Sequence, residues 1–227
     1  MAELLHSGTV SFLFTDIEGS TRLLQELGDR YGELVKDHRR IMRAAARKSG
    51  GVEVDTQGDA FFFSFPRARD AVLAAAAAQR ALRAHEWPDA MPARVRMGLH
   101  TGEPTVGDEG YLGLDVVRAS RICSAANGGQ ILLSQTTRML LPDLPEGLEI
   151  LDLGAASLKD LEHEHLFELV VDGEQGAAPR APAVPESFGE RLSAEITQQV
   201  MKDVRESFSP SMEGKPRKRW GWPRRRG

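Results

Sequence analysis

The sequence predicts a mixed α+β fold, in which a β-sheet is covered by helices. Residues 9–15 form an apolar run that does not alternate, which is typical of a strand buried on both faces. Helical spacing of apolar residues follows this run and returns at residues 68–85. Two strand-like runs flank a turn at Gln57 and Gly58, which indicates a β-hairpin. The order of these elements predicts a sheet with its helices largely on one face.

The boundaries of the elements follow from turn and cap residues. After the first strand, Ser20 or Thr21 is expected to cap a helical segment that runs to about Arg47. Gly28 and Gly32 lie inside this segment, so either one helix or two helices are compatible with it. The other predicted elements are a hairpin over 52–65, a helix over 68–85, a strand over 93–103, a helix over 114–126, a strand over 128–134 and a last strand over 166–171.

Composition places the chain among ordinary globular proteins. Its 227 residues are 41% hydrophobic and 27% charged, which suffices for one domain and an appendage. No apolar run reaches the roughly 18 residues of a membrane span, and the N-terminus lacks a signal-peptide pattern. We therefore expect a cytoplasmic protein. The single cysteine, Cys123, fits a reducing compartment, and we expect it in the core.

The C-terminal part of the chain has a different composition. Residues 173–186 are rich in Gly, Ala and Pro and predict a linker, and residues 187–209 have the apolar spacing of an amphipathic helix. We expect this helix to dock on the protein's own domain or on a dimer partner, with membrane binding as the alternative. Residues 210–227 carry a net charge of +6, which leaves −10 on the remainder of a chain whose total is −4.

This basic C-terminal stretch is expected to be a disordered tail. The interpretation leaves two functional options for residues 215–226, contact with an anionic membrane surface or with nucleic acid. In the first case the protein would be peripheral at a membrane. The acidic remainder of the chain is not suited to wrapping nucleic acid.

Two carboxylates are expected to meet at one edge of the sheet. Asp16 follows the first strand and Asp59 follows the hairpin turn, so pairing of the hairpin beside that strand would bring them together. Two close carboxylates repel each other and usually hold a cation between them. The turn at residues 19–21 opens a helix, whose free N–H groups favour phosphate. The pattern predicts a metal-dependent site for a nucleoside triphosphate, with a purely structural turn as the alternative.

Further polar residues lie in the segments that follow. Arg118 and Arg121 are on a helix that begins at a glycine loop, and arginine is suited to bidentate phosphate contacts. A solvated helix face is the alternative for both. His100 and Glu103 flank this region, and we interpret His100 as a packing or supporting residue and not as a catalytic base.

Five motifs resemble the successive signatures of the class III nucleotidyl cyclase catalytic domain, in the bacterial adenylate/guanylate cyclase branch. They occur in family order and are FTDIEGST, GDAFFFSF, RMGLHTGEP, GLDVVRASRI and GGQILLS. The resemblance implies a ferredoxin-like α+β domain over residues 8–172. It also implies a head-to-tail homodimer with two composite sites between the subunits.

The resemblance assigns roles to individual residues. Asp16 and Asp59 match the metal-binding aspartates, and the Ile17 carbonyl matches a backbone ligand, for two Mg²⁺ or Mn²⁺ ions per site. Arg121 of the partner subunit matches the arginine that stabilises charge on the α-phosphate, and Lys159 matches a lysine that contacts the triphosphate. The turn that cradles the β- and γ-phosphates consists of Ile17, Glu18, Gly19, Ser20 and Thr21.

Three positions depart from the family pattern. Asp55 stands where active members have an adenine-selecting lysine, and Gly110 stands where they have its aspartate partner. Val117 replaces the asparagine that orients the ribose. The residues for metal and phosphate chemistry are therefore present, whereas those for base recognition are not.

The resemblance implies conversion of a nucleoside triphosphate, with ATP favoured over GTP, to its 3′,5′-cyclic monophosphate and pyrophosphate in signal transduction. One alternative is a catalytically weak or silent module that binds nucleotide or pairs with another cyclase chain. A remote alternative is a haloacid dehalogenase phosphatase, whose signature of a strand that ends in Asp-x-Asp-Gly resembles residues 12–21 except at Glu18.

Overall fold

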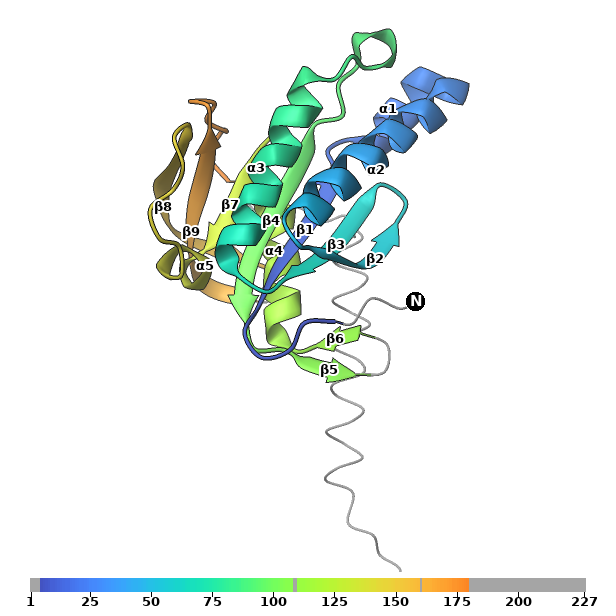
Figure 1. Ribbon diagram of the computed structural model, residues 1–227. Coiled ribbons are helices and arrows are strands. Elements are labelled where there is room, and N and C mark those ends of the chain that lie inside the picture. Colours follow the sequence, from blue (N-terminus) through green and yellow to red (C-terminus); the bar gives the residue numbers. More distant parts are fainter. Residues whose placement is uncertain (1–4, 108–109, 160, 180–227) are drawn as a thin grey trace, which may run out of the picture.

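The computed structural model describes residues 5–107, 110–159 and 161–179. One sheet contains seven strands in the order β2-β3-β1-β4-β7-β9-β8, and β5 and β6 form a separate hairpin (Figure 1). Among the described strand pairs only β4 and β7 are parallel, so the predicted α+β fold is confirmed. The strands are β1 (Val10–Ile17), β2 (Val52–Gln57), β3 (Ala60–Phe65), β4 (Val95–Gly102), β5 (Thr105–Gly107), β6 (Gly110–Leu112), β7 (Ile131–Ser134), β8 (Leu148–Leu158) and β9 (Leu161–Val171).

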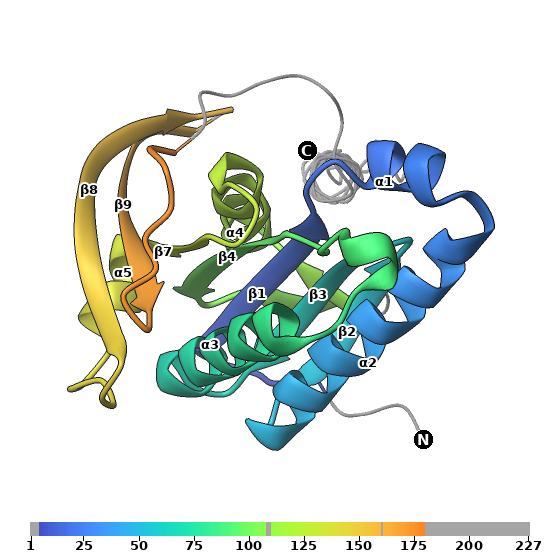
Figure 2. The same cartoon turned by 90° about the horizontal axis from the view of Figure 1, so that it is seen from above.

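Helices cover both faces of the sheet (Figure 2). The buried side chains of α1, α2 and α3 share one core cluster on one face, and those of α4 lie in two clusters on the other face. The expectation of helices largely on one face holds for α1 to α3 and is wrong for α4. The α-helices are α1 (Ser20–Leu27), α2 (Tyr31–Lys48), α3 (Ala68–Ala84), α4 (Leu114–Ala125) and α5 (Gln135–Met139), with short 3₁₀ turns η1 (Gly28–Arg30) and η2 (Pro88–Ala90).

A glycine explains how closely α4 approaches the sheet. A Cβ atom added at Gly98 on β4 would lie 2.2 Å from the backbone nitrogen of Cys123. Only a residue without a side chain fits this contact. Cys123 is buried as predicted, and burial raises the pKa of its thiol to about 12.

The central strands β1 and β3 are buried on both faces, which the continuous apolar sequence of residues 9–15 predicted for β1. Alternate side chains of β3 point to opposite sides of the sheet. Phe61 and Phe63 stack in the cluster under α2 and α3, while Phe62 contacts Phe12 and Phe14 in the cluster under α4. The strand that carries the first candidate carboxylate is therefore held rigidly from two sides.

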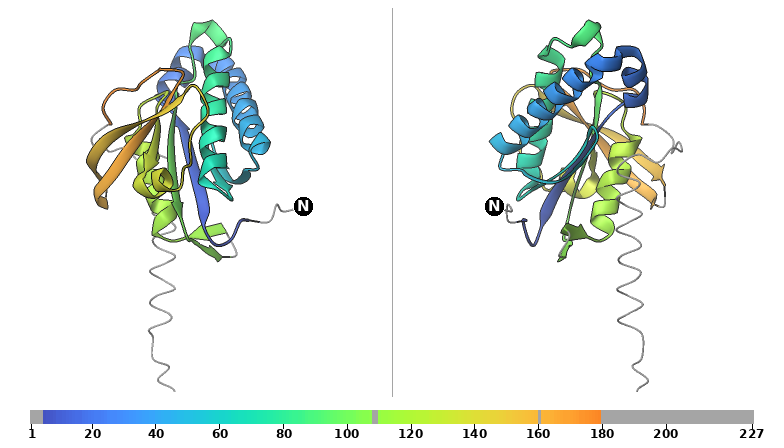
Figure 3. Two further views of the ribbon diagram at one scale, coloured as in Figure 1. Left: turned by 60° about the vertical axis from the view of Figure 1, so that its left-hand side comes forward. Right: turned by 90° about the vertical axis from the view of Figure 1, so that its right-hand side faces the viewer.

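Several local details differ from the sequence-based expectations. The helical segment is interrupted at Gly28, whereas Gly32 lies inside α2. Ser20 and Thr21 do not cap α1 and are its first residues, because Gly19 takes the cap position with a left-handed φ of 68°. The β5-β6 hairpin, α5 and β8 were not predicted. Strands β8 and β9 form the sheet edge farthest from α2 (Figure 3).

The segment that follows β9 is still attached to the domain. The Asn127 side chain donates to the carbonyls of Ala177 and Ala178, and the buried Glu168 carboxylate accepts from the Gly176 N–H at 2.6 Å. The described part of the predicted linker thus runs along the domain surface. The domain boundary at 172 stays a prediction, and the predicted helix over 187–209 and the tail over 210–227 lie outside the described residues. Within the described residues, no helix is long and apolar enough to cross a membrane.

Candidate active site

The two carboxylates that the sequence analysis identifies as candidate metal ligands lie together at one end of β1. Asp16 is near the end of β1, and Asp59 is in the turn between β2 and β3, which pairs with β1 in antiparallel register. The Ile17 N–H donates to the Asp59 carboxylate with an N···Oδ2 distance of 3.2 Å. Their predicted convergence at one edge of the sheet is confirmed.

The negative charge of this pair is only partly compensated by neighbouring groups. Burial, together with the charge of Asp16, raises the pKa of Asp59 to about 6, although hydrogen bonds from Ile17 and Ser20 oppose the shift. Burial also raises the pKa of the Tyr31 hydroxyl, with the Asp59 charge as the second cause. Negative charge therefore concentrates at the point that Asp16, Asp59, Ser20 and Tyr31 surround.

A cationic neighbour of Asp16 was missed by the sequence analysis. The Arg96 guanidinium donates to Asp16 Oδ2, and the two residues are register partners on β1 and β4. Both side chains are 17% exposed. Arg96 supplies Asp16 with a countercharge, whereas a bound cation would chiefly compensate Asp59. Strand register, which the sequence does not show, is the signal that would have found Arg96.

The residues present fit a divalent cation that prefers oxygen ligands. Two carboxylates and the Ser20 hydroxyl converge, and one carboxylate has a pKa raised by burial and by its anionic neighbour. Such donors suit Mg²⁺ or Mn²⁺. No group of three or more His, Cys, Asp or Glu side chains that could hold an ion occurs in the described ranges. An ion here would take its remaining ligands from backbone oxygen, substrate phosphate and water.

The turn after Asp16 offers backbone donors beside the carboxylates. α1 begins at Ser20, and its first intrahelical bond runs from the Leu23 N–H to the Gly19 carbonyl at 3.1 Å. The N–H groups before Leu23 precede this bond and are the usual anion-binding groups of a helix N-terminus. The neighbouring Glu18 packs toward the loop after α4, since a Cβ at Gly128 would lie 2.7 Å from Glu18 Oε2.

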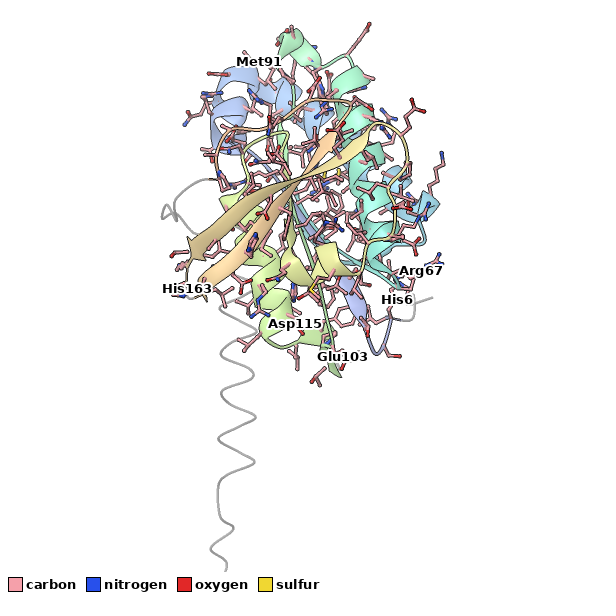
Figure 4. All side chains as sticks on the ribbon, turned by 90° about the vertical axis from the view of Figure 1, so that its left-hand side faces the viewer. His6, Arg67, Met91, Glu103, Asp115 and His163 are labelled. Carbon is pink, nitrogen blue, oxygen red and sulfur yellow. The ribbon has the colours of Figure 1, made fainter. Side chains whose placement is uncertain are left out.

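His100 lies in a buried network remote from the carboxylate pair. Its ring nitrogens contact Ser134 Oγ at 2.8 Å and Asp115 Oδ1 at 3.0 Å. Asp115 also accepts from the Glu103 N–H, and Figure 4 shows Asp115 and Glu103 together at one end of the molecule, with Met91 at the other. His100 is four residues along β4 from Arg96, which corresponds to roughly 13 Å. Both ring nitrogens of His100 are engaged inside this network, which agrees with its interpretation as a packing or supporting residue.

Comparison with known proteins identifies the family. The model of the adenylate and guanylate cyclase catalytic domain matches residues 3–170. The chain belongs to this family. An adenylate cyclase of Podospora anserina is 36% identical over 153 residues, covering 56% of this chain and 7% of that protein. An uncharacterized protein of Mycobacterium tuberculosis is 35% identical over 164 residues, covering 71% of this chain and 55% of the relative.

Solved structures of cyclases share the fold. A Trypanosoma brucei adenylate cyclase, analysed in its monomeric state, matches with a TM-score of 0.71 and 27% identity, covering 78% of this chain and 96% of that chain. The chain thus spans less than a tenth of the fungal cyclase but nearly all of the trypanosomal domain. The phosphatase alternative is wrong, because the matched region includes the motif on which it rested.

The three departures from the cyclase pattern lie outside the carboxylate pair. The Asp55 carboxylate accepts from the Thr56 N–H at 2.7 Å, and Val117 is 7% exposed on α4. Gly110 lies beside β2, since a Cβ added there would be 3.8 Å from Val54 Cγ1. Gly110 and Val117 bring no polar side chain to a base or a sugar.

Two other residues that match cyclase positions are Lys159 and Arg121. Lys159 lies at the end of the sheet opposite the carboxylates, and Arg121 is buried. Lys159 is exposed in the turn between β8 and β9. β4 is antiparallel to β1 and parallel to β7, and β7 is antiparallel to β9, so β9 runs in the same direction as β1. The turn before β9 therefore lies at the end of the sheet opposite Asp16, which is near the end of β1. Figure 4 shows His163, from the same hairpin, at the end opposite Met91. Arg121 is 7% exposed on α4. Arg118, the other arginine considered for phosphate contacts, donates to Glu164 at 2.7 Å.

Proposed function

We propose that this cyclase domain converts a nucleoside triphosphate, with ATP favoured over GTP, to the 3′,5′-cyclic monophosphate and pyrophosphate. The observation that carries the proposal is the convergence of Asp16 and Asp59 beside the helix-opening turn. The adenylate cyclase names of the fungal and trypanosomal relatives favour ATP.

The residues of this chain would divide the work as follows. Asp16, Asp59 and the Ile17 carbonyl would hold two Mg²⁺ or Mn²⁺ ions, which lower the pKa of the ribose 3′-hydroxyl and neutralise the phosphates when bound. The turn from Ile17 through Glu18 and Gly19 to Ser20 and Thr21 would hold the β- and γ-phosphates through its N–H groups. Arg96 would orient the Asp16 carboxylate through their contact.

The geometry of one chain supports a site shared between two. Lys159 lies at the opposite end of the sheet from Asp16, so a lysine that touches the same triphosphate would have to come from a second subunit. A head-to-tail homodimer provides this arrangement twice. Arg121 of the partner subunit would then stabilise charge on the α-phosphate, and removing such a contact typically lowers the rate about 100 to 1000-fold.

Product analysis tests the activity. We expect purified full-length protein with Mn²⁺ and ATP to form a cyclic nucleotide that mass spectrometry detects, and Asp16→Asn to abolish it. Asp29→Asn is the matched control, because Asp29 is an exposed acid on η1. Absence of cyclic product from both ATP and GTP would overturn the proposal and leave family membership intact.

Mixing of variants tests the shared site. Asp16→Ala subunits mixed with Arg121→Ala subunits should regain one complete site per mixed dimer. The experiment is repeated with Lys159→Ala, because Lys159 is exposed and its removal spares the core, whereas Arg121 is buried. Activity of both mixtures that stays at the level of the separate variants would contradict a composite site.

The second candidate is a catalytically silent module that binds nucleotide or pairs with another cyclase chain. Asp55, Gly110 and Val117 favour it, since base and ribose recognition are altered while the carboxylates remain. Calorimetry with a non-hydrolysable ATP analogue and Mn²⁺ separates the two candidates when it is run beside the turnover assay. Binding without turnover supports the silent module, and turnover excludes it.

A further inference from the structure

A basic groove runs along the outer side of α2, and only Asp59, at one end of it, belongs to the proposed catalytic residues. Its volume is about 810 Å³, within the usual range of small-molecule sites. One end reaches the turn of Gly58 and Asp59, and Tyr31 and Val35 line part of it. The cations that line it are Lys36, Arg39, Arg40, Arg43 and Arg47.

The spacing of these cations concentrates positive charge on one helix face. Each of them has another member of the row three or four residues away, and residues at this spacing are neighbours on a helix surface. Like charges at such spacing repel each other and destabilise a helix. Lys36 and Arg47 are eleven residues apart, so the row extends over about 16 Å. An acidic protein with a net charge of −4 thus carries an elongated basic surface.

Carboxylates of the protein compensate only part of this charge. Arg43 forms two 2.7 Å bonds to Glu53, and Arg40 contacts Asp37 at 3.1 Å. Lys36, Arg39 and Arg47 form no ion pair within 4.0 Å among the described residues, although the charge of Arg47 also acts on Glu53. The Nε atoms of Arg39 and Arg47 donate to backbone carbonyls, those of Gly58 and Arg43, each at 3.2 Å.

The groove is also ordered before any ligand arrives. Arg43 is held by Glu53 and by its position over the Phe61 ring, with its guanidinium carbon 5.3 Å from the ring centroid. Arg39 is held by the Gly58 carbonyl. Fixed guanidinium groups lose little freedom on binding and match the oxygens of a phosphate in pairs.

We propose that this groove binds a soluble anion that carries a chain of two or more phosphoryl groups. A chain of phosphates matches an elongated row of cations better than a single carboxylate or sulfate does. The negative charge of Asp59 at one end would repel the anion, so it would lie over the Arg39 to Arg47 part of α2. This site differs from the proposed catalytic site, because it uses α2 cations and requires no metal ion.

Inorganic tripolyphosphate in EDTA is the probe, because EDTA removes metal-dependent binding at the carboxylate pair. Calorimetry on the full chain should show one site per chain whose affinity falls with rising salt. Arg39→Gln combined with Arg47→Gln should weaken binding at least tenfold. Arg69→Gln, an exposed arginine on α3, is the matched control and should bind as the wild type does. Circular dichroism of each variant confirms that the fold is retained.

Asp16→Ala separates this inference from the proposed catalysis. Tripolyphosphate binding in EDTA should be unchanged in Asp16→Ala even if that variant forms no cyclic nucleotide. Absence of binding to the wild type would overturn the inference, as would equal binding by the Arg39/Arg47 double variant. Binding of phosphatidylserine vesicles that depends on Arg39 and Arg47, without binding of tripolyphosphate, would assign the groove to a membrane surface and would also overturn it.

Discussion

The buried His38 gives the sharpest stability prediction. It is 0% exposed on α2, and its ring lies 5.7 Å from that of Phe61. Neither ring nitrogen has a hydrogen-bond partner among the described residues. Burial, assisted by the charge of Arg39, lowers the pKa of His38 from 6.5 to about 3. The imidazole is therefore neutral in the folded protein at any physiological pH.

The sign of the pH effect follows from this lowered pKa. Because the unfolded chain binds a proton at His38 more readily than the folded chain does, acid favours unfolding. The contribution to stability is complete above pH 6.5 and declines as the pH falls toward 3. Each pH unit below 6.5 costs about 1.4 kcal/mol, so lowering the pH from 7 to 5 should cost about 2 kcal/mol. His38→Leu should remove this loss, together with two buried nitrogens that lack partners.

Urea unfolding at pH 7 and pH 5, in EDTA and at constant ionic strength, measures the effect. The wild type should lose about 2 kcal/mol more between the two pH values than His38→Leu does. Asp59 titrates in the same range but alike in both proteins, so it cancels in the comparison. His163→Asn, an exposed histidine with a φ of 62°, should behave as the wild type does. Equal losses in the wild type and His38→Leu would refute the reasoning.

Three further predictions follow from the carboxylate pair and from the glycines. In EDTA at pH 8, Asp59→Asn should raise the free energy of unfolding by about 2 to 3 kcal/mol, because the pKa of Asp59 is about 6 in the folded protein and 3.8 in the unfolded chain. This gain in stability should vanish below pH 3.8, where the carboxyl is protonated in both states. Mn²⁺ at ten times its dissociation constant should stabilise the wild type by about 1.4 kcal/mol in thermal unfolding and leave Asp59→Asn unchanged. Gly98→Ala should cost about 2 kcal/mol or more, since its Cβ would meet Cys123 at 2.2 Å, whereas Gly32→Ala in α2, with open space, should gain up to about 1 kcal/mol.

Local signals predicted the parts of the fold that local chemistry decides. The Gly58 turn closed the β2-β3 hairpin, and Gly28 divided the first helical segment. The convergence of Asp16 and Asp59 followed because β3 pairs with β1, the simplest arrangement for a hairpin after a buried strand. These conclusions required no knowledge of the complete sheet.

The features that were missed depend on contacts between distant parts of the chain. Strand β8 (Leu148–Leu158) is largely exposed and contains Gly154, so its sequence lacks a strand pattern, and its pairing with β9 defines it. The partner of Asp16 required the β1-β4 register that places Arg96 opposite it. The position of α4 on the second face depends on the space that Gly98 leaves for Cys123.

The effect of the Asp59 charge on the stability of the protein also bears on the choice between an active and a silent cyclase. A carboxylate whose pKa is raised by burial and by Asp16 destabilises the metal-free fold at neutral pH. Structural needs do not explain it, because an asparagine would accept the Ile17 N–H equally well. A chain without a use for a cation would gain stability by losing this charge. If Asp59→Asn proves stabilising in EDTA, the retained carboxylate speaks for metal binding; if it is destabilising, Asp59 is structural and the silent module gains.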